Sequence, residues 1–289
     1  MSSYEYHFII TNGITLHVVQ AGPQQGPLVI LLHGFPEFWY GWRKQIDYLA
    51  EKGYRVWAPD QRGYNLSEKP PKIKDYRVEL LAKDIAGLIE AAGREKAYIA
   101  GHDWGAMVAW NLAISYPEKV EKLAILNVPH PEVMRHALTH RLSQLVRSTY
   151  AIFFQIPWLP EKLTGLNNWM LGTRAMKSSS RPGTFSESDL EQYRQAWSQP
   201  GAMTSMLNWY RASVRYPPRF PSTEAATVKV PTLIIWGAKD LFLKAEMAQQ
   251  SLDYCQDGQL KYFEQATHWV QHEEAVSVNQ LLADFFSQP

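Results

Sequence analysis

The run Tyr98-Ile99-Ala100-Gly101-His102-Asp103-Trp104-Gly105 decides how the rest of the chain is interpreted. It begins as a short apolar strand, and residues 105–116 have the residue spacing of a helix. The pattern G-x-D-x-G is typical of a tight strand-to-helix turn that holds its central side chain exposed on a strained backbone. A strand-end aspartate by itself more often caps a helix. The second flanking glycine and the partner residues described below favour another role, in which Asp103 is a nucleophile.

Segments typical of strands and helices alternate on both sides of this turn. An alternating segment typical of a strand occurs at 14–19. Apolar runs, which are typical of parallel strands covered on both faces, follow at 28–32, 54–58, 97–100, 123–126, 231–236 and 260–263. Helical patterns occur at 42–52, 77–92, 105–116 and 273–286. Thr11-Asn12-Gly13 has the composition of a hairpin turn before the first of these strands. The alternation predicts an α/β protein with a mostly parallel, doubly wound sheet.

The alternation stops after Val128. Residues 129–219 contain helical patterns at 142–154, 189–197 and 203–215 but no convincing strand, and a proline-rich run, 217–221, follows them. We therefore expect a core made of residues 1–128 and 220–289, interrupted by an all-helical cap at 129–219, which we call the cap segment. This organisation, together with the turn at Asp103, predicts the α/β-hydrolase fold.

Most such turns carry a serine as the nucleophile, but this chain has no G-x-S-x-G anywhere. The aspartate in its place restricts the reactions that the site can catalyse. A carboxylate, with a reference pKa of about 4, is an anion at neutral pH and needs no base before it attacks. Attack on an ester or amide would form a reactive anhydride, whereas attack on a saturated carbon with a leaving group forms a stable ester. The sequence therefore predicts an epoxide or an alkyl halide as substrate.

The oxyanion hole is predicted from the backbone N–H groups of Phe35 and Trp104. Phe35 lies in His33-Gly34-Phe35-Pro36, directly after a strand, and Trp104 follows the nucleophile. The two groups would stabilise the tetrahedral anion formed when water cleaves the ester. Phe35–Pro36 is a candidate cis peptide bond. His33 and His102 are interpreted as packing residues behind the site, and Asp60 as a structural residue.

The triad order of this fold is nucleophile, acid and histidine. Asp240 follows a predicted strand, and His268 follows the last one by a short loop. We expect His268 to deprotonate water. Asp240 is expected to orient the His268 ring and to stabilise its imidazolium form. The alternative base is His272, but its position before Glu273-Glu274 is typical of an exposed helix end.

The leaving group separates the two substrate classes. A halide leaves without a proton, whereas an epoxide oxygen leaves as an alkoxide and needs an acid, for which tyrosine is suited. Tyr150 and Tyr210 in the cap segment are candidates. Their spacing alone fits packing of the cap better.

The chain resembles the soluble-type epoxide hydrolases of the α/β-hydrolase fold over nearly its whole length. The motifs that carry the resemblance are the turn at 101–105, His33-Gly34-Phe35-Pro36, Phe154-Gln155-Ile156-Pro157 and Asn208-Trp209-Tyr210-Arg211. The resemblance implies that Tyr150 and Tyr210 hold and protonate the ring oxygen. It also implies the roles of nucleophile, acid and histidine for Asp103, Asp240 and His268.

Two other functions stay open at this point. Haloalkane dehalogenases share the aspartate turn, often with a following tryptophan, so Trp104 does not discriminate between the two. Fluoroacetate dehalogenases carry arginines soon after the nucleophile, and residues 104–112 contain none. A non-catalytic binding protein on this fold is the alternative of another class.

The substrate is expected to be a small lipophilic epoxide, with water as the second reactant. Aromatic residues in and beside the cap segment predict an apolar pocket, with Phe38, Trp39, Phe153 and Trp209 as substrate-binding candidates. The bulky run Glu37-Phe38-Trp39-Tyr40 is expected to narrow it.

Composition points to a cytoplasmic enzyme, and the predicted reaction needs no cofactor or metal. The net charge of the 289 residues is +1, which offers no basic field for nucleic acid or an anionic membrane. The single cysteine, Cys255, excludes an internal disulfide and suits a reducing compartment. No signal peptide or membrane-spanning pattern is found. The sequence does not distinguish a monomer from a homodimer.

Overall fold

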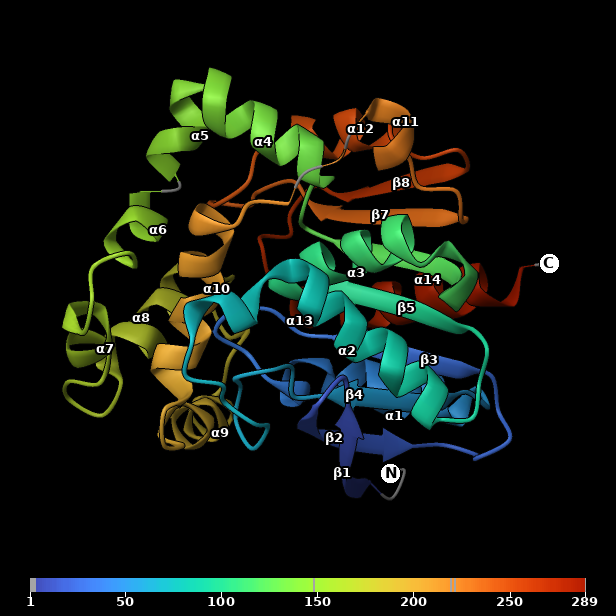
Figure 1. Ribbon diagram of the computed structural model, residues 1–289, viewed down its shortest axis with the longest axis horizontal. Helices are drawn as coiled ribbons and strands as arrows, with labels where there is room; N and C mark the ends of the chain where they lie inside the picture. Colours follow the sequence, from blue (N-terminus) through green and yellow to red (C-terminus); the bar gives the residue numbers. More distant parts are fainter. Residues whose placement is uncertain (1–3, 148, 219, 221, 289) are drawn as a thin grey trace.

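The structure is a computed structural model that describes residues 4–147, 149–218, 220 and 222–288. Its centre is one eight-stranded sheet in the order β1-β2-β4-β3-β5-β6-β7-β8 (Figure 1). The strands are β1 (Glu5–Thr11), β2 (Ile14–Ala21), β3 (Leu28–Leu32), β4 (Arg55–Pro59), β5 (Ala97–His102), β6 (Val120–Leu126), β7 (Thr232–Gly237) and β8 (Gly258–Phe263). β2 pairs antiparallel with β1 and β4, and every other pair is parallel. The predicted fold class is confirmed.

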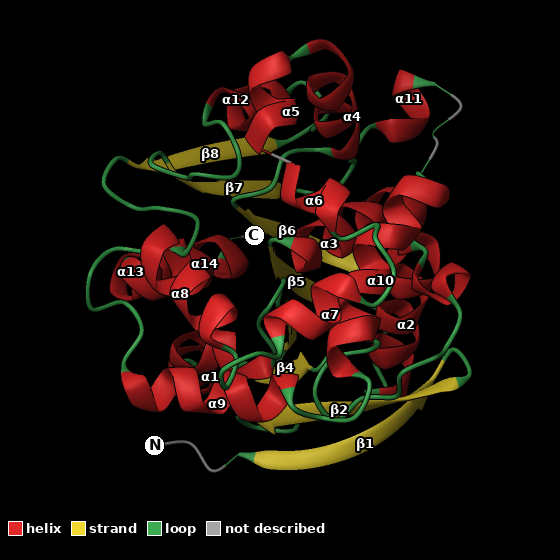
Figure 2. Cartoon of the chain, turned by 90° about the vertical axis from the view of Figure 1, so that its left-hand side faces the viewer, coloured by secondary structure: helices red, strands yellow, loops and turns green. Residues whose placement is uncertain are grey.

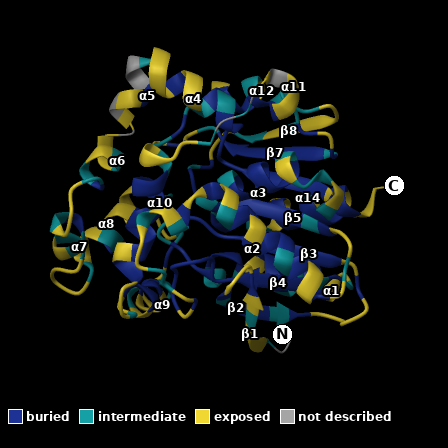
Figure 3. Ribbon diagram, in the orientation of Figure 1, coloured by how far each residue is buried: buried dark blue, intermediate teal, exposed yellow. Residues whose placement is uncertain are grey.

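Helices cover both faces of the sheet. One hydrophobic cluster joins α1 (Arg43–Glu51) and α14 (Ala275–Ser287) to one face, and a larger cluster joins α2 (Val78–Ala91) and α3 (Trp104–Ser115) to the other. The central strands β3 and β5 are therefore almost entirely buried, as the dark blue strands of Figure 3 show. This burial explains why their sequences are continuously apolar rather than alternating. The shorter elements are η1 (Trp39–Trp42), η2 (Ile73–Tyr76), η3 (Pro117–Lys119), α12 (Glu246–Leu252) and α13 (Val270–Glu273).

Between β6 and β7 the described residues form helices, which lie beside one end of the sheet in Figure 1 and in front of it in Figure 2. They are α4 (Pro131–His140), α5 (Leu142–Arg147), α6 (Thr149–Phe153), α7 (Leu159–Thr164), α8 (Met170–Ser179), α9 (Glu187–Trp197), α10 (Ala202–Arg215) and α11 (Thr223–Ala226). The single helix predicted at 142–154 was wrong in its extent, because two short helices occupy most of it. Ser148 between them, and Arg219 at the predicted end of the cap segment, lie outside the described residues.

Three helices within the cap segment, α4, α7 and α8, were not predicted. Each is short, with six to ten residues. So few turns give no clear apolar stripe in the sequence, and contacts with neighbouring elements stabilise them instead. No helix in the described part of the chain is long and apolar enough to cross a bilayer.

Candidate active site

Asp103 lies in the turn between β5 and α3 with φ 51° and ψ −125°, a conformation that is unusual for a residue with a side chain. The flanking glycines permit this turn. A methyl group on Gly105 would lie 2.1 Å from the carbonyl oxygen of Leu32, and one on Gly101 would lie 2.5 Å from the carbonyl oxygen of Gly105. The strand and helix approach each other so closely that only glycine fits at either position.

The end of β3 brings a backbone donor to this carboxylate. Leu32 pairs with Gly101 in the parallel register of β3 and β5, so the loops after both strands emerge side by side. The Phe35 N–H donates a hydrogen bond of 2.7 Å to Oδ1 of Asp103. A methyl group on Gly34 would lie 2.3 Å from Cβ of Asp103, so glycine is needed for this approach as well. The Phe35–Pro36 bond is cis, as the sequence suggested.

His268 lies between two carboxylates and is buried. Its Nε2 is 3.4 Å from Oδ2 of Asp103, and its Nδ1 is 2.7 Å from Oδ2 of Asp240. Burial by itself lowers the pKa of this imidazole. The charge of Asp240 and hydrogen bonds to both carboxylates outweigh burial and raise the pKa of His268 to about 10. The structure thus brings the three predicted triad residues together.

Asp240 is held by more donors than the sequence indicated. The side-chain amide of Asn127 donates to its Oδ2 at 2.7 Å, and the N–H groups of Phe242 and Leu243 donate to its Oδ1. Burial by itself raises the pKa of this carboxyl, but the charge of His268 and these hydrogen bonds hold it below its usual value. Asn127 was missed. Its only signal is its place directly after β6, at the edge where the carboxyl ends of parallel strands meet.

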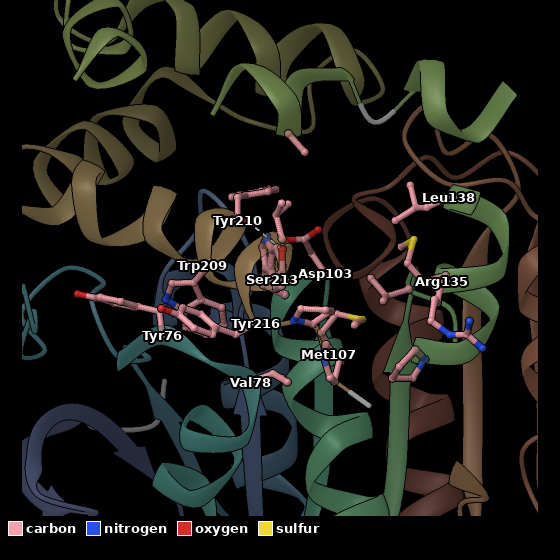
Figure 4. A pocket seen from close by; sticks show the side chains of 18 of the residues that line it. Tyr76, Val78, Asp103, Met107, Arg135, Leu138, Trp209, Tyr210, Ser213 and Tyr216 are labelled. Atoms are coloured by element: carbon pink, nitrogen blue, oxygen red, sulfur yellow. Dashed lines mark hydrogen bonds between the residues drawn. The ribbon is translucent and has the colours of Figure 1, made fainter. Parts of the chain in front are cut away.

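Tyr150 of α6 and Tyr210 of α10 line the same pocket as Asp103. Their rings lie 5.9 Å apart in an edge-to-face arrangement, and Tyr210 makes similar contacts with Phe35 and Trp104. Figure 4 shows Tyr210 beside Asp103. Burial raises the pKa of both tyrosines, and the negative charge of Asp103 raises it further. Both hydroxyls therefore carry their protons at neutral pH.

The pocket around these residues has a volume of about 550 Å³ and is lined mainly by apolar side chains. In Figure 4 it extends on both sides of Asp103, with Tyr76 at one side and Leu138 at the other. Met107 of α3 and Val78 of α2 belong to its wall. These residues were not predicted, because their sequence patterns are those of ordinary packing positions.

One of the four predicted substrate-binding residues, Trp209, lines this pocket, and Phe38, Trp39 and Phe153 do not. Phe38 is buried and packs on Tyr40 and Tyr193. Because the chain turns into η1 after Pro36, these rings face the first strands and α9 instead of narrowing the pocket. Phe153 contacts its neighbour Phe154.

The interpretation of His272 as an exposed helix end was wrong. Its side chain is buried, and its Nε2 lies 2.7 Å from a carboxylate oxygen of Glu37. Glu37 also accepts hydrogen bonds from Tyr193 and Gln271, behind the triad. His102 in the same layer contacts the carbonyl oxygen of His268, which agrees with a supporting role.

Known proteins resemble this chain over most of its length. Residues 27–275 match the family described as alpha/beta hydrolase fold. The AB hydrolase superfamily protein YfhM of Bacillus subtilis is 46% identical over 289 residues, which cover 99% of each chain. Human Epoxide hydrolase 4 is 37% identical over 294 residues, covering 100% of this chain and 80% of that protein. The crystal structure of Bacillus megaterium epoxide hydrolase in complex with an inhibitor superposes with a TM-score of 0.87 at 32% identity, over 98% of this chain and 100% of that one.

Proposed function

Because the chain belongs to the α/β-hydrolase fold family and, within it, to the epoxide hydrolases, we propose that it converts a lipophilic epoxide to a vicinal diol. We further propose that the reaction passes through a covalent ester on Asp103. The observation that carries this proposal is the placement of Tyr150 and Tyr210 in the same pocket as Asp103, whose carboxylate lies beside His268 and, through it, Asp240. A halide would need no such proton donors, so the tyrosine pair favours an epoxide over an alkyl halide.

In the first step one carboxylate oxygen of Asp103 attacks a ring carbon, and the bond between that carbon and the ring oxygen breaks. Oδ1 already accepts the Phe35 N–H, which favours Oδ2 as the attacking atom. The ring oxygen takes a proton from Tyr150 or Tyr210. The products of this step are an ester on Asp103, a free hydroxyl on the substrate and one tyrosinate.

In the second step Nε2 of His268 takes a proton from water, and the resulting hydroxide attacks the carbonyl carbon of the ester. The tetrahedral anion accepts hydrogen bonds from the N–H groups of Phe35 and Trp104. Collapse of this intermediate expels the second oxygen of the diol and leaves Asp103 as a carboxylic acid, which loses its proton to solvent and becomes the carboxylate again. The imidazolium returns its proton to the leaving oxygen, and the tyrosinate is reprotonated from solvent.

The cap segment, residues 129–219, has a defined part in this proposal. It supplies both proton donors, from α6 and α10, whereas the nucleophile, base and acid come from the core. The cap segment also contributes apolar side chains that exclude water from the reacting carbon.

A trapping experiment tests the proposal. In His268→Gln the attack by Asp103 remains while water activation is lost, so intact-mass analysis after adding an epoxide should show protein heavier by one substrate molecule. Peptide mapping should find the added mass on Asp103. The control variant Asp103→Ala/His268→Gln should remain unmodified. Modification of another residue, or a fully active His268→Gln variant, would reject the mechanism.

A further inference from the structure

The mouth of the pocket is bordered by exposed apolar side chains. Five large apolar residues that line the pocket each expose between 37% and 61% of their surface: Leu138, Leu145, Ile152, Val214 and Tyr216. We call them the rim residues. They belong to α4, α5, α6 and the end of α10, on the side of the molecule that faces the viewer in Figure 2. Exposed apolar patches of this kind mark contact surfaces.

The apolar surface continues beyond α6. Ile156 is 43% exposed and Trp158 is 66% exposed. Trp158 has a left-handed backbone with φ 55°, a conformation that is unfavourable for a residue with a side chain. Its ring borders a second hollow, which is also lined by Ile73, Lys162 and Arg215.

Five basic residues line the second hollow or are neighbours of its apolar side chains in space or in sequence, and we call them the docking cations: Lys72, Lys74, Arg77, Lys162 and Arg215. Lys72 and Lys74 flank Ile73, while Arg77 lies over the Tyr216 ring and Lys162 over the Trp158 ring. None of the five forms an ion pair with another described residue. Their charges are therefore available to an external partner.

The charge of the whole chain is also unevenly distributed. Residues 129–219 contain eleven Lys and Arg but only five Asp and Glu, a net charge of +6, although the whole chain carries +1. The rest of the chain therefore carries −5. Part of this excess is paired with carboxylates of the core, as in Arg141–Glu246 and Arg181–Glu274. Lys162 and Arg215 have no ion pair among the described residues, so the partner that this surface fits is apolar and negatively charged.

We propose that the rim residues, Trp158 and the docking cations form a surface that binds an anionic lipid bilayer. The apolar side chains would reach the boundary between headgroups and acyl chains, and the cations would contact lipid phosphates. Binding of this kind does not depend on epoxide chemistry. Its consequence, the entry of a lipophilic epoxide from the bilayer directly into the pocket, rests on the proposed function. The net charge of the whole chain, only +1, by itself predicts no membrane contact. That value conceals the difference in charge between residues 129–219 and the rest of the chain.

Co-sedimentation with vesicles tests the proposal without substrate. The wild-type chain should sediment with vesicles of equal parts phosphatidylcholine and phosphatidylglycerol, but not with phosphatidylcholine alone, and high salt should weaken its binding. Each cation near an anionic surface changes binding about fivefold. Lys162→Gln/Arg215→Gln should therefore lower the partition coefficient by roughly 25-fold. The matched control is Lys52→Gln/Lys229→Gln, whose lysines precede the amino ends of β4 and β7, and it should bind like wild type.

A second pair of variants tests the apolar contribution. Ile156→Ser/Trp158→Ser should lower binding by about tenfold or more. Ile10→Ser, at a residue 77% exposed on the edge strand β1, should leave binding unchanged. Thermal melts should be unaffected in all variants, because the altered side chains are exposed. None of them lines the pocket around Asp103, so turnover of a short, water-soluble epoxide should also stay at the wild-type rate.

The remaining outcomes overturn the proposal. These are a wild-type chain that stays in the supernatant, equal binding to vesicles without phosphatidylglycerol, or equal losses in test and control variants. Light scattering without vesicles gives a further check. If Ile156→Ser/Trp158→Ser converts a dimer to a monomer, a second copy of the chain covers this surface instead of a bilayer. Vesicle binding by a chain that hydrolyses no epoxide would reject the proposed function alone.

Discussion

The two oxygens of the Asp103 carboxylate have different surroundings. Oδ1 accepts the backbone N–H of Phe35, while Oδ2 faces Nε2 of His268 at 3.4 Å. In the proposed mechanism Oδ1 becomes the carbonyl oxygen of the ester, and Oδ2 is the atom that attacks. Tyr150 and Tyr210, from two different helices, complete the site with two protonated hydroxyls.

The first prediction at this scale concerns these two tyrosines. Tyr150→Phe and Tyr210→Phe should each slow ester formation but leave activity, because the other hydroxyl can still protonate the ring oxygen. The double variant loses all general-acid assistance, which lowers the rate by about 10² to 10⁴. Rapid-quench measurement of ester accumulation reports this step directly. If the double variant melts like wild type and opens epoxides at the wild-type rate, the tyrosines only pack the cap segment.

A second prediction concerns pH and His268. Its pKa of about 10 in the free protein depends in part on the charge and hydrogen bond of Asp103. Esterification neutralises Asp103, so the pKa of His268 should fall below about 10 in the ester. Because water attack needs neutral imidazole, the rate of ester hydrolysis should rise with pH and level off above that lower pKa. Single-turnover hydrolysis over a pH series measures it, and a rate that falls as pH rises would contradict this role.

At the scale of elements, the site depends on how parallel strands end. Leu32 of β3 pairs with Gly101 of β5, which sets the Phe35 N–H beside Asp103. Leu126 of β6 pairs with Ile235 of β7, which sets Asn127 beside Asp240. Neighbouring strands in register therefore place the residues that follow them within hydrogen-bonding distance.

The close approach of β5 and α3 at their turn predicts that replacing Gly105 by alanine destabilises the protein. In Gly105→Ala the new methyl group would overlap the backbone of Leu32, at 2.1 Å from its carbonyl oxygen. The strand and helix must separate, so the free energy of unfolding should fall by about 1–3 kcal/mol and ester formation should slow. Urea denaturation measures the first effect. Gly165→Ala, where the methyl group would meet no atom closer than 3.4 Å, is the control and should change stability by less than about 0.5 kcal/mol.

At the scale of the whole molecule, the site combines two parts of the chain with different tasks in the proposed mechanism. The cap segment carries the proton donors for ester formation, and the core carries the groups that hydrolyse the ester. Asn127 lies where the chain leaves the core for the cap segment, and it holds Asp240 in place.

This division predicts which step a change in the core affects. Asn127→Gly removes the amide that bonds Asp240, and glycine tolerates the local φ of 49°. Ester hydrolysis should slow by roughly tenfold or more, while ester formation stays near the wild-type rate, so the ester should accumulate. Rapid-quench analysis separates the two rates. Equal slowing of both steps would indicate general loss of structure, which thermal melts would detect independently.

The amino-acid sequence by itself determined the fold class, the turn at Asp103 and the succession of Asp103, Asp240 and His268. These features are local, because a tight turn needs glycines at fixed spacing and a buried parallel strand needs a continuous apolar run. The structure agrees with these predictions in the sheet and in the contacts of His268 with both carboxylates.

Only the tertiary structure decided which side chains surround the pocket and which support the triad. Phe38 and Trp39 looked like pocket residues but pack elsewhere, His272 looked exposed but is buried, and Asn127 gave no sequence signal beyond its position. The physical reason is the same in each case: the direction and exposure of a side chain depend on contacts between elements far apart in the sequence.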